Sequence, residues 1–121
     1  MLMEQGTSLA VEVEAVPGAA LIRLTGELDA STAPRLEQIG AELVAAGHSD
    51  LVIDCDGLSF CDSGGLHALL VLHAAADPDG TVTVARPRDG VARLLAVTRL
   101  DAYLTVSPDL PAPWAPTAGG T

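Results

Sequence analysis

The chain has 121 residues and a formal net charge of -10, with 16 Asp and Glu against 6 Lys and Arg. Binding of DNA or RNA depends on clustered Lys and Arg, and single strands are bound by stacking on aromatic side chains, which make up only 2% of this chain. These numbers exclude a nucleic-acid partner. No apolar run approaches the roughly 20 residues of a membrane span, and the first residues lack the basic and apolar regions of a secretory signal, so we expect a cytoplasmic protein with no membrane partner.

The length fits one domain, and the composition changes at both ends. We expect a flexible N-terminal arm over residues 1–7 and one folded domain over residues 8–107. Residues 108–121 contain four prolines and a Gly-Gly pair, with little apolar surface to bury. This composition predicts a Pro-rich flexible tail.

The first two predicted strands form a hairpin. Leu9, Val11 and Val13 alternate with polar or small residues, which predicts a strand with one wet face at the edge of a sheet. Pro17-Gly18 is a turn signal, and residues 20–25 form a second apolar run. The short connection favours antiparallel pairing of the two strands.

Two helices and a buried strand follow the hairpin. Residues 34–47 begin with Pro, carry apolar residues at helical spacing and end with Gly, which predicts the first helix. Residues 51–53 predict a short buried strand, and the acidic residues from Asp54 predict a loop after it. From Leu66 to residue 76 the apolar residues again follow helical spacing.

The remainder of the domain continues this alternation. Residues 77–80 break the second helix, residues 81–84 predict a strand, and residues 87–99 predict a third helix. Residues 103–106 predict a short last strand. The order of elements predicts an α/β fold with a mixed, mostly parallel sheet that begins with the antiparallel hairpin.

Ser63 lies where the predicted loop meets the second helix, within Asp62-Ser63-Gly64-Gly65-Leu66. A helix N-terminus has unpaired backbone N–H groups that can receive a phosphate oxygen. The same residues are also ordinary helix-capping chemistry. From the residues alone, capping is the favoured interpretation.

Two blocks of the chain resemble the STAS domain family, the anti-sigma-factor antagonists. One block is Asp62-Ser63-Gly64-Gly65-Leu66, which matches the family's Asp-Ser-x-Gly-Leu after the central strand, and the other is residues 22–29, IRLTGELD. The blocks stand in the family's order, and the match spans residues 8–107. The resemblance implies a single STAS-like domain whose helices lie mainly on one face of the sheet.

The resemblance also implies a function. Such a protein binds an anti-sigma factor when unphosphorylated and so frees the sigma factor. The anti-sigma factor, an ATP-dependent serine kinase, then ends the interaction by phosphorylating the serine of the motif, here Ser63, and a serine/threonine phosphatase resets it. The protein itself is not an enzyme and carries no cofactor. The partner-binding residues that the resemblance implies are Asp29, Asp62, Ser63, Gly64, Gly65, Leu66 and His67.

Three features leave alternatives open. The helix from Leu66 is apolar almost all round, so it is either buried on two sides or exposes a docking face beside Ser63. Asp29 is either a turn or capping acid or a residue that recognises the partner. Arg99-Leu100 stands where family members often have Gly-Leu, so the end of the third helix departs from the family's pattern.

The alternative function is a STAS docking module or subunit of a larger assembly, such as a lipid-transport complex or a stress-sensing complex, that does not depend on phosphorylation of Ser63. An enzyme is disfavoured, because a nucleophile elbow needs Gly where Cys61 stands and no His follows His73. Cys55 and Cys61 have no His at a zinc-ligand spacing. The two His of the second helix lie on different faces, so no metal site is predicted.

Overall fold

In the computed structural model, which describes residues 8–115, the chain begins with an antiparallel hairpin. β1 (Leu9–Val16) and β2 (Ala19–Leu28) are joined at Pro17-Gly18, where Gly18 has a φ of +79°, a conformation that favours glycine. β1 lies at one edge of the sheet. The predicted edge strand and the predicted hairpin are both confirmed.

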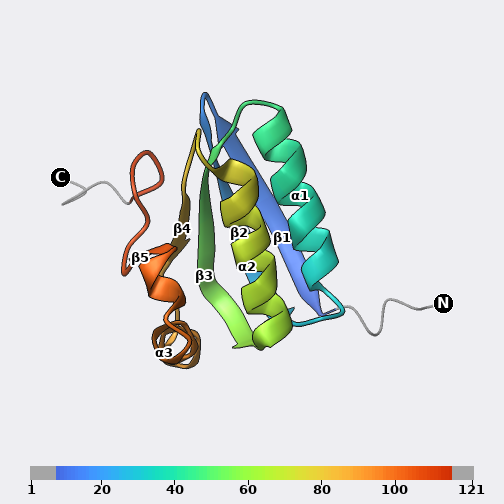
Figure 1. Ribbon diagram of the computed structural model, residues 1–121, viewed down its shortest axis with the longest axis vertical. Helices are drawn as coiled ribbons and strands as arrows, with labels where there is room; N and C mark the ends of the chain where they lie inside the picture. The colour runs from blue at the N-terminus through green and yellow to red at the C-terminus, as the bar shows by residue number, and fades with distance from the viewer. Residues whose placement is uncertain (1–7, 116–121) are drawn as a thin grey trace.

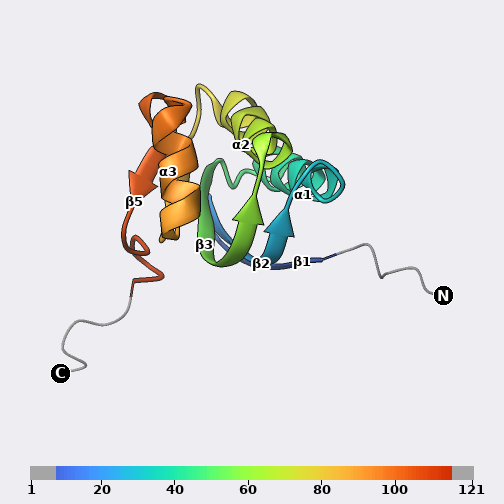
Figure 2. The ribbon, with the colours of Figure 1, turned by 90° about the horizontal axis from the view of Figure 1, so that it is seen from below.

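The other strands extend the sheet in parallel, in the order β1-β2-β3-β4-β5. They are β3 (Asp50–Cys61), β4 (Val82–Ala85) and β5 (Thr105–Ser107). The connections hold α1 (Ala33–Ala45), α2 (Ser63–Ala76), α3 (Asp89–Val97) and the short 3-10 helix η2 (Leu100–Ala102). α1 and α2 lie side by side on one face of the sheet, and α3 lies beside β3 at one end (Figures 1 and 2). The predicted fold class is confirmed.

The main core lies between the sheet and its helices. α1 and α2 approach closely because Gly40 has no side chain; a Cβ there would collide with the side chain of Leu72. α3 adds Val91 and Leu95 to the same core. No helix between residues 8 and 115 is long and apolar enough to cross a membrane.

β2 and β3 both run further than the sequence predicts. The predicted end of the second strand at residue 25 and the predicted loop from Asp54 are wrong in part, because the two strands stay paired as far as Leu28 and Cys61. Two register shifts along this stretch of the pair accommodate the irregular residues. The paired ends of β2 and β3 carry the chain to the start of α2.

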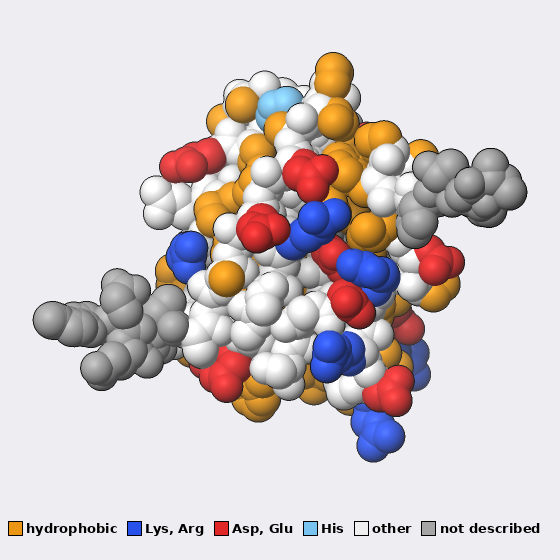
Figure 3. All heavy atoms as spheres, turned by 180° about the vertical axis from the view of Figure 1, so that it is seen from behind, with side chains coloured by type: hydrophobic (Ala, Val, Ile, Leu, Met, Phe, Trp, Pro, Cys, Tyr) orange, Lys and Arg blue, Asp and Glu red, His pale blue; other side chains and the backbone are white. Residues whose placement is uncertain are grey.

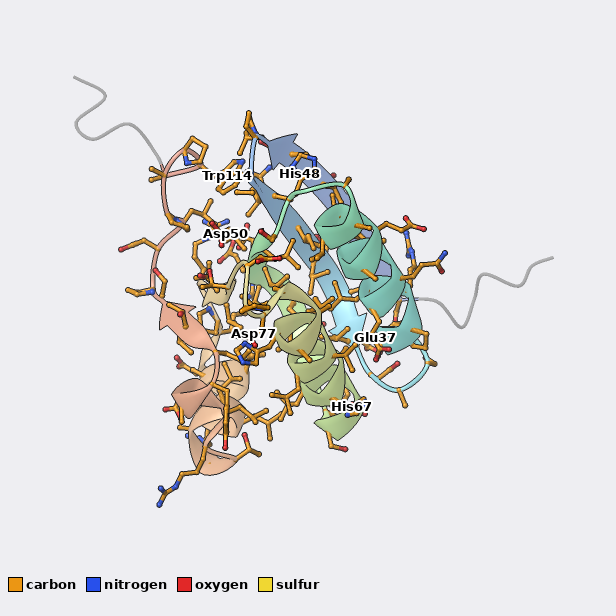
Figure 4. All side chains as sticks on the ribbon, turned by 45° about the horizontal axis from the view of Figure 1, so that its top comes forward. Glu37, His48, Asp50, His67, Asp77 and Trp114 are labelled. Atoms are coloured by element: carbon orange, nitrogen blue, oxygen red, sulfur yellow. The ribbon has the colours of Figure 1, made fainter. Side chains whose placement is uncertain are left out.

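The face of the sheet without α1 and α2 holds a second apolar cluster, which consists of Leu21, Val52, Ala85 and Leu110 with Trp114 packed against it. Leu110 is only 7% exposed, although it belongs to the predicted tail. Trp114 lies toward the end of the sheet where β1 turns into β2 (Figure 4). The flexibility of the arm and tail stays a prediction, and residues 1–7 and 116–121 lie outside the described residues.

Candidate partner-binding and phosphorylation site

α2 begins at Ser63 because the side chain of Asp62 caps it. Oδ1 of Asp62 accepts hydrogen bonds from the N–H groups of Gly64 at 2.9 Å and Gly65 at 3.2 Å. The carbonyl oxygen of Asp62 accepts a hydrogen bond from Leu66 N–H at 3.0 Å. Ser63 is exposed. The capping role therefore belongs to Asp62, and Ser63 beside it is exposed to solvent.

Gly64 and Gly65 allow three segments to meet at this site. A Cβ on Gly64 would lie 2.8 Å from the backbone N and Cα of Ala30. A Cβ on Gly65 would lie 2.7 Å from the carbonyl oxygen of Leu28 and 2.8 Å from Sγ of Cys61. These separations are shorter than atoms of a packed interior tolerate. Glycine at both positions lets α2 start directly against the end of β2 and the turn after it.

Asp29 shapes that turn. Its Oδ1 accepts hydrogen bonds from the Ser31 hydroxyl at 2.7 Å, from Ser31 N–H at 2.9 Å and from Thr32 N–H at 3.1 Å. The bond from the Ser31 hydroxyl is the main cause that holds the pKa of Asp29 below its usual value, and burial opposes it. The turn role of Asp29 is therefore visible in the structure, and a role in recognising the partner stays a prediction.

The remaining predicted site residues divide between the core and the surface. Gly65 and Leu66 are buried, so the Leu66 side chain packs inside the fold. His67 is exposed near the start of α2 (Figure 4). The solvent side of the helix forms an α2 outer stripe at helical spacing, in which Ser63, His67 and Ala74 are exposed and Leu70 and Val71 are half-buried. α2 is thus buried along one side and exposes a mixed stripe that starts at Ser63.

Phe60 is a candidate that sequence reasoning missed. It is 48% exposed, lies near the end of β3 and pairs with Glu27 of β2. The acidic residues from Asp54 predict a loop over this stretch, with no role for Phe60. The only available signal was a large aromatic residue two positions before Asp62, in a chain with few aromatic residues.

The helix-free face of the sheet carries a charged cluster, where acidic and basic side chains alternate (Figure 3). Asp54 is 3% exposed and accepts hydrogen bonds from Nε of Arg86 at 3.1 Å and Nη2 at 2.7 Å. Arg23 lies 3.7 Å from the same carboxylate. Burial alone raises the pKa of Asp54, but the hydrogen bonds outweigh it and hold this pKa below its usual value. Arg88 likewise donates to the Asp56 carbonyl oxygen at 2.6 Å, so both arginines fix the chain after β4 to β3.

The two cysteines have unreactive surroundings. Burial raises the pKa of Cys55 to about 12 and that of Cys61 to about 11. Both thiols are therefore protonated at neutral pH, and the thiolate is the reactive form. Within residues 8–115, no three His, Cys, Asp or Glu side chains come together as metal ligands.

A protein-family model described as "Mlab, STAS domain" matches residues 11–107. An anti-sigma factor antagonist from Mycobacterium paratuberculosis is 31% identical, over 85% of this chain and 88% of that chain, with a TM-score of 0.77. The anti-sigma factor antagonist SpoIIAA in its unphosphorylated form is 20% identical over 84% of this chain and 90% of its own, with a TM-score of 0.66. Bacillus SpoIIAA in its phosphorylated form has the same TM-score of 0.66, at 19% identity over 80% of this chain and 90% of its own.

The SpoIIAA structures, at these identities, support the fold alone. The family model is stronger evidence, because it spans almost all of the folded residues and both blocks around Asp29 and Ser63. The mycobacterial relative adds sequence identity over most of both chains. The chain therefore belongs to the STAS domain family.

Proposed function

We propose that this protein is an anti-sigma-factor antagonist that works by partner switching. Unphosphorylated, it binds an anti-sigma factor in the cytoplasm and frees a sigma factor. The anti-sigma factor uses ATP to phosphorylate Ser63, which releases the complex, and a serine/threonine phosphatase restores the starting form. The protein acts as substrate and binding partner, not as an enzyme. The observation that carries the proposal is the exposed Ser63 at the capped start of α2, within a family-type motif.

Charge explains why a phosphate on Ser63 would end the interaction. A phosphoserine adds about -1.5 to -2 charges at neutral pH. The side chain of Asp62 already accepts hydrogen bonds from the N–H groups of Gly64 and Gly65. The start of the helix therefore has few free N–H groups to stabilise a second anion. At about 5 Å, each added unit charge repels Asp62 by under 1 kcal/mol in water and by about 3 kcal/mol at an effective dielectric constant near 20. The free protein tolerates the phosphate, and a dry interface over Ser63 does not.

The interface proposed here contains the surface around Ser63. It includes the α2 outer stripe, with His67, and the turn at Asp29 that Gly64 contacts. Gly65 and Leu66 are buried, so they pack beneath this surface and do not contact the partner directly. Phe60, at 48% exposure beside the site, adds an aromatic side chain of the kind that dominates binding energy at protein interfaces.

The test combines phosphorylation and binding. The ATP-binding anti-sigma factors of the same organism are purified, and each is assayed for phosphate transfer to wild type and to Ser63→Ala, and for affinity to wild type and to Ser63→Asp. We expect one of them to phosphorylate only a chain with Ser63, and its affinity to fall at least about tenfold for Ser63→Asp. Ser49→Asp, which adds a charge before β3 at the opposite end of that strand, should bind normally. Equal affinity for wild type and Ser63→Asp would refute the proposal.

A second candidate function is a STAS docking subunit of a larger assembly, such as a lipid-transport or stress-sensing complex. The specific observation in its favour is the family model that matches residues 11–107, because its description, "Mlab, STAS domain", does not name an anti-sigma factor antagonist. This alternative predicts a stable complex whose affinity is unchanged by Ser63→Ala and by Ser63→Asp. The same pair of variants therefore separates the two candidates.

A further inference from the structure

The end of the third helix forms a corner with an unusual surface. We define the α3 corner by four residues, Arg93 and Val97 on the last turns of α3 and Arg99 and Tyr103 on either side of η2. Val97 is 69% exposed and Tyr103 is 64% exposed, which are the two highest values among the exposed large apolar side chains between residues 8 and 115. The core does not use them, because Val91 and Leu95 supply the buried side of α3.

The two arginines whose guanidinium groups have neither an ion-pair nor a hydrogen-bond partner among the described residues also lie at this corner. All six cationic side chains of the chain are arginines. Four of them are bound: Arg23 and Arg86 to Asp54, Arg35 to the Leu9 carbonyl oxygen and Arg88 to the Asp56 carbonyl oxygen. The guanidinium groups of Arg93 and Arg99 contact no carboxylate and make no hydrogen bond within residues 8–115. A chain of net charge -10 thus presents its free cations beside its most exposed apolar side chains.

The backbone at Arg99 is strained for this residue type. Arg99 has a φ of +63°, in the left-handed region, directly after the Thr98 cap of α3. Glycine is the residue that suits this position after a helix, and any other residue costs stability. Residues held in such conformations cluster at functional sites. Arg99 is exposed, so its strained backbone does not serve to place its side chain in the core.

All four residues of the corner come from one short segment of the chain, residues 93–103. Arg93 and Val97 are one helical turn apart on the same side of α3. Arg99 N–H donates a hydrogen bond to the Ala96 carbonyl oxygen at 3.2 Å, and Tyr103 N–H donates one to the Leu100 carbonyl oxygen at 2.9 Å. The chain therefore keeps turning tightly through η2. α3 lies at the same end of the molecule as the start of α2, where Ser63 is found (Figures 1 and 2).

We propose that the α3 corner is a second docking surface, which binds an acidic segment with an apolar side chain on the same anti-sigma factor. The inference rests on the proposed function and names a contact away from Ser63. Arg and Tyr are the residue types enriched where interfaces hold most of their binding energy. Two guanidinium groups without a partner between residues 8 and 115, against the one exposed carboxylate of Asp101 in η2, leave the corner with a net positive charge that complements an acidic segment. The partner therefore touches the chain at two places, and phosphorylation changes only one of them.

The test measures the affinity of the anti-sigma factor that binds wild type most tightly. The corner variants are the double variant Arg93→Gln/Arg99→Gly and the single variant Val97→Ser. The matched control is Val13→Ser, which removes an exposed valine (42%) from β1 at the opposite edge of the sheet. We expect the double variant to lose about tenfold or more in affinity, with a weaker dependence on salt, and its Tm to be no lower than that of wild type because glycine suits the backbone at position 99.

The outcomes separate this inference from the proposed function. Weaker binding of both corner variants, with the control unchanged and the Tm retained, supports the docking surface. Unchanged affinity of the corner variants, while Ser63→Asp is released, overturns the corner and leaves partner switching intact. A lowered Tm of the double variant with unchanged affinity assigns the two arginines to stability and also overturns the corner. If no anti-sigma factor of the organism binds the wild-type chain, both proposals are refuted.

Discussion

Replacement of Gly64 by Ala tests whether the turn at Asp29 is packed against the start of α2. The new Cβ would lie 2.8 Å from the backbone N and Cα of Ala30 and 3.1 Å from its Cβ, whereas ordinary contact begins at 3.4 Å. Backbone atoms cannot swing aside as a long side chain can, so either the turn or the helix must move. Overpacking of this kind costs about 1–3 kcal/mol, and the better helix propensity of Ala offsets at most about 1 kcal/mol of it. We expect a net loss of about 1–2 kcal/mol in the free energy of unfolding.

The control for this prediction is Gly90→Ala. Gly90 is the second residue of α3, as Gly64 is the second residue of α2, and no atom lies within 4 Å of a Cβ built on it. This variant should gain up to about 1 kcal/mol from helix propensity alone. Urea unfolding followed by circular dichroism measures both variants. Equal stability changes in the two would refute the close packing of Ala30 on Gly64. A displaced turn should also weaken binding of the anti-sigma factor, which Gly90→Ala should leave unchanged.

Three further predictions concern stability and reactivity. Arg86→Met should destabilise the fold at pH 7 by about 2 kcal/mol, less than for a fully buried pair because the Arg86 side chain is 38% exposed and Arg23 remains near Asp54. The folded-state pKa of Asp54 is lowered, so this contribution is complete above the unfolded pKa of about 3.9 and should fade in urea titrations as the pH falls below it. Leu110→Ala should lower the free energy of unfolding by about 2 kcal/mol, measured from unfolding curves followed by fluorescence of the single Trp. A change under about 0.5 kcal/mol would mean that Leu110 is not packed against the sheet. The two cysteines should resist thiol reagents at pH 7 until urea unfolds the chain, and fast labelling of the folded protein would contradict their raised pKa values.

The elements that the sequence predicted well are those with local causes. β1 shows the alternation of a half-buried strand, and Pro17-Gly18 makes its turn within two residues. α2 starts where Asp62 can cap it, and the cap is a bond between residues two and three apart in the chain. These signals are readable because the interacting residues are neighbours in the sequence.

The elements that the sequence missed depend on residues far apart. β3 continues through Asp54 and Asp56, which are typical of a loop, because pairing with β2 and bonds from Arg86 and Arg88 hold this stretch as a strand. Leu110 lies among prolines and is buried only because the helix-free face of the sheet offers Leu21, Val52 and Ala85. Nothing in the local sequence indicates either partner. The contact of Gly64 with Ala30 is likewise a meeting of two segments, which the residue types alone do not reveal.

The packing around Ser63 bears on how the proposed switch operates. Gly64 and Gly65 are so closely approached by Ala30, Leu28 and Cys61 that the start of α2 has little room to rearrange. Asp62 already occupies the N–H groups that a phosphate would otherwise attract. In the proposed switch, a phosphate on Ser63 would therefore project into solvent instead of reorganising the fold, and only a partner surface that covers Ser63 would be affected. There, about 3 kcal/mol per unit charge corresponds to more than about a hundredfold in affinity, which is enough for one exposed hydroxyl to reverse the binding of an otherwise unchanged domain.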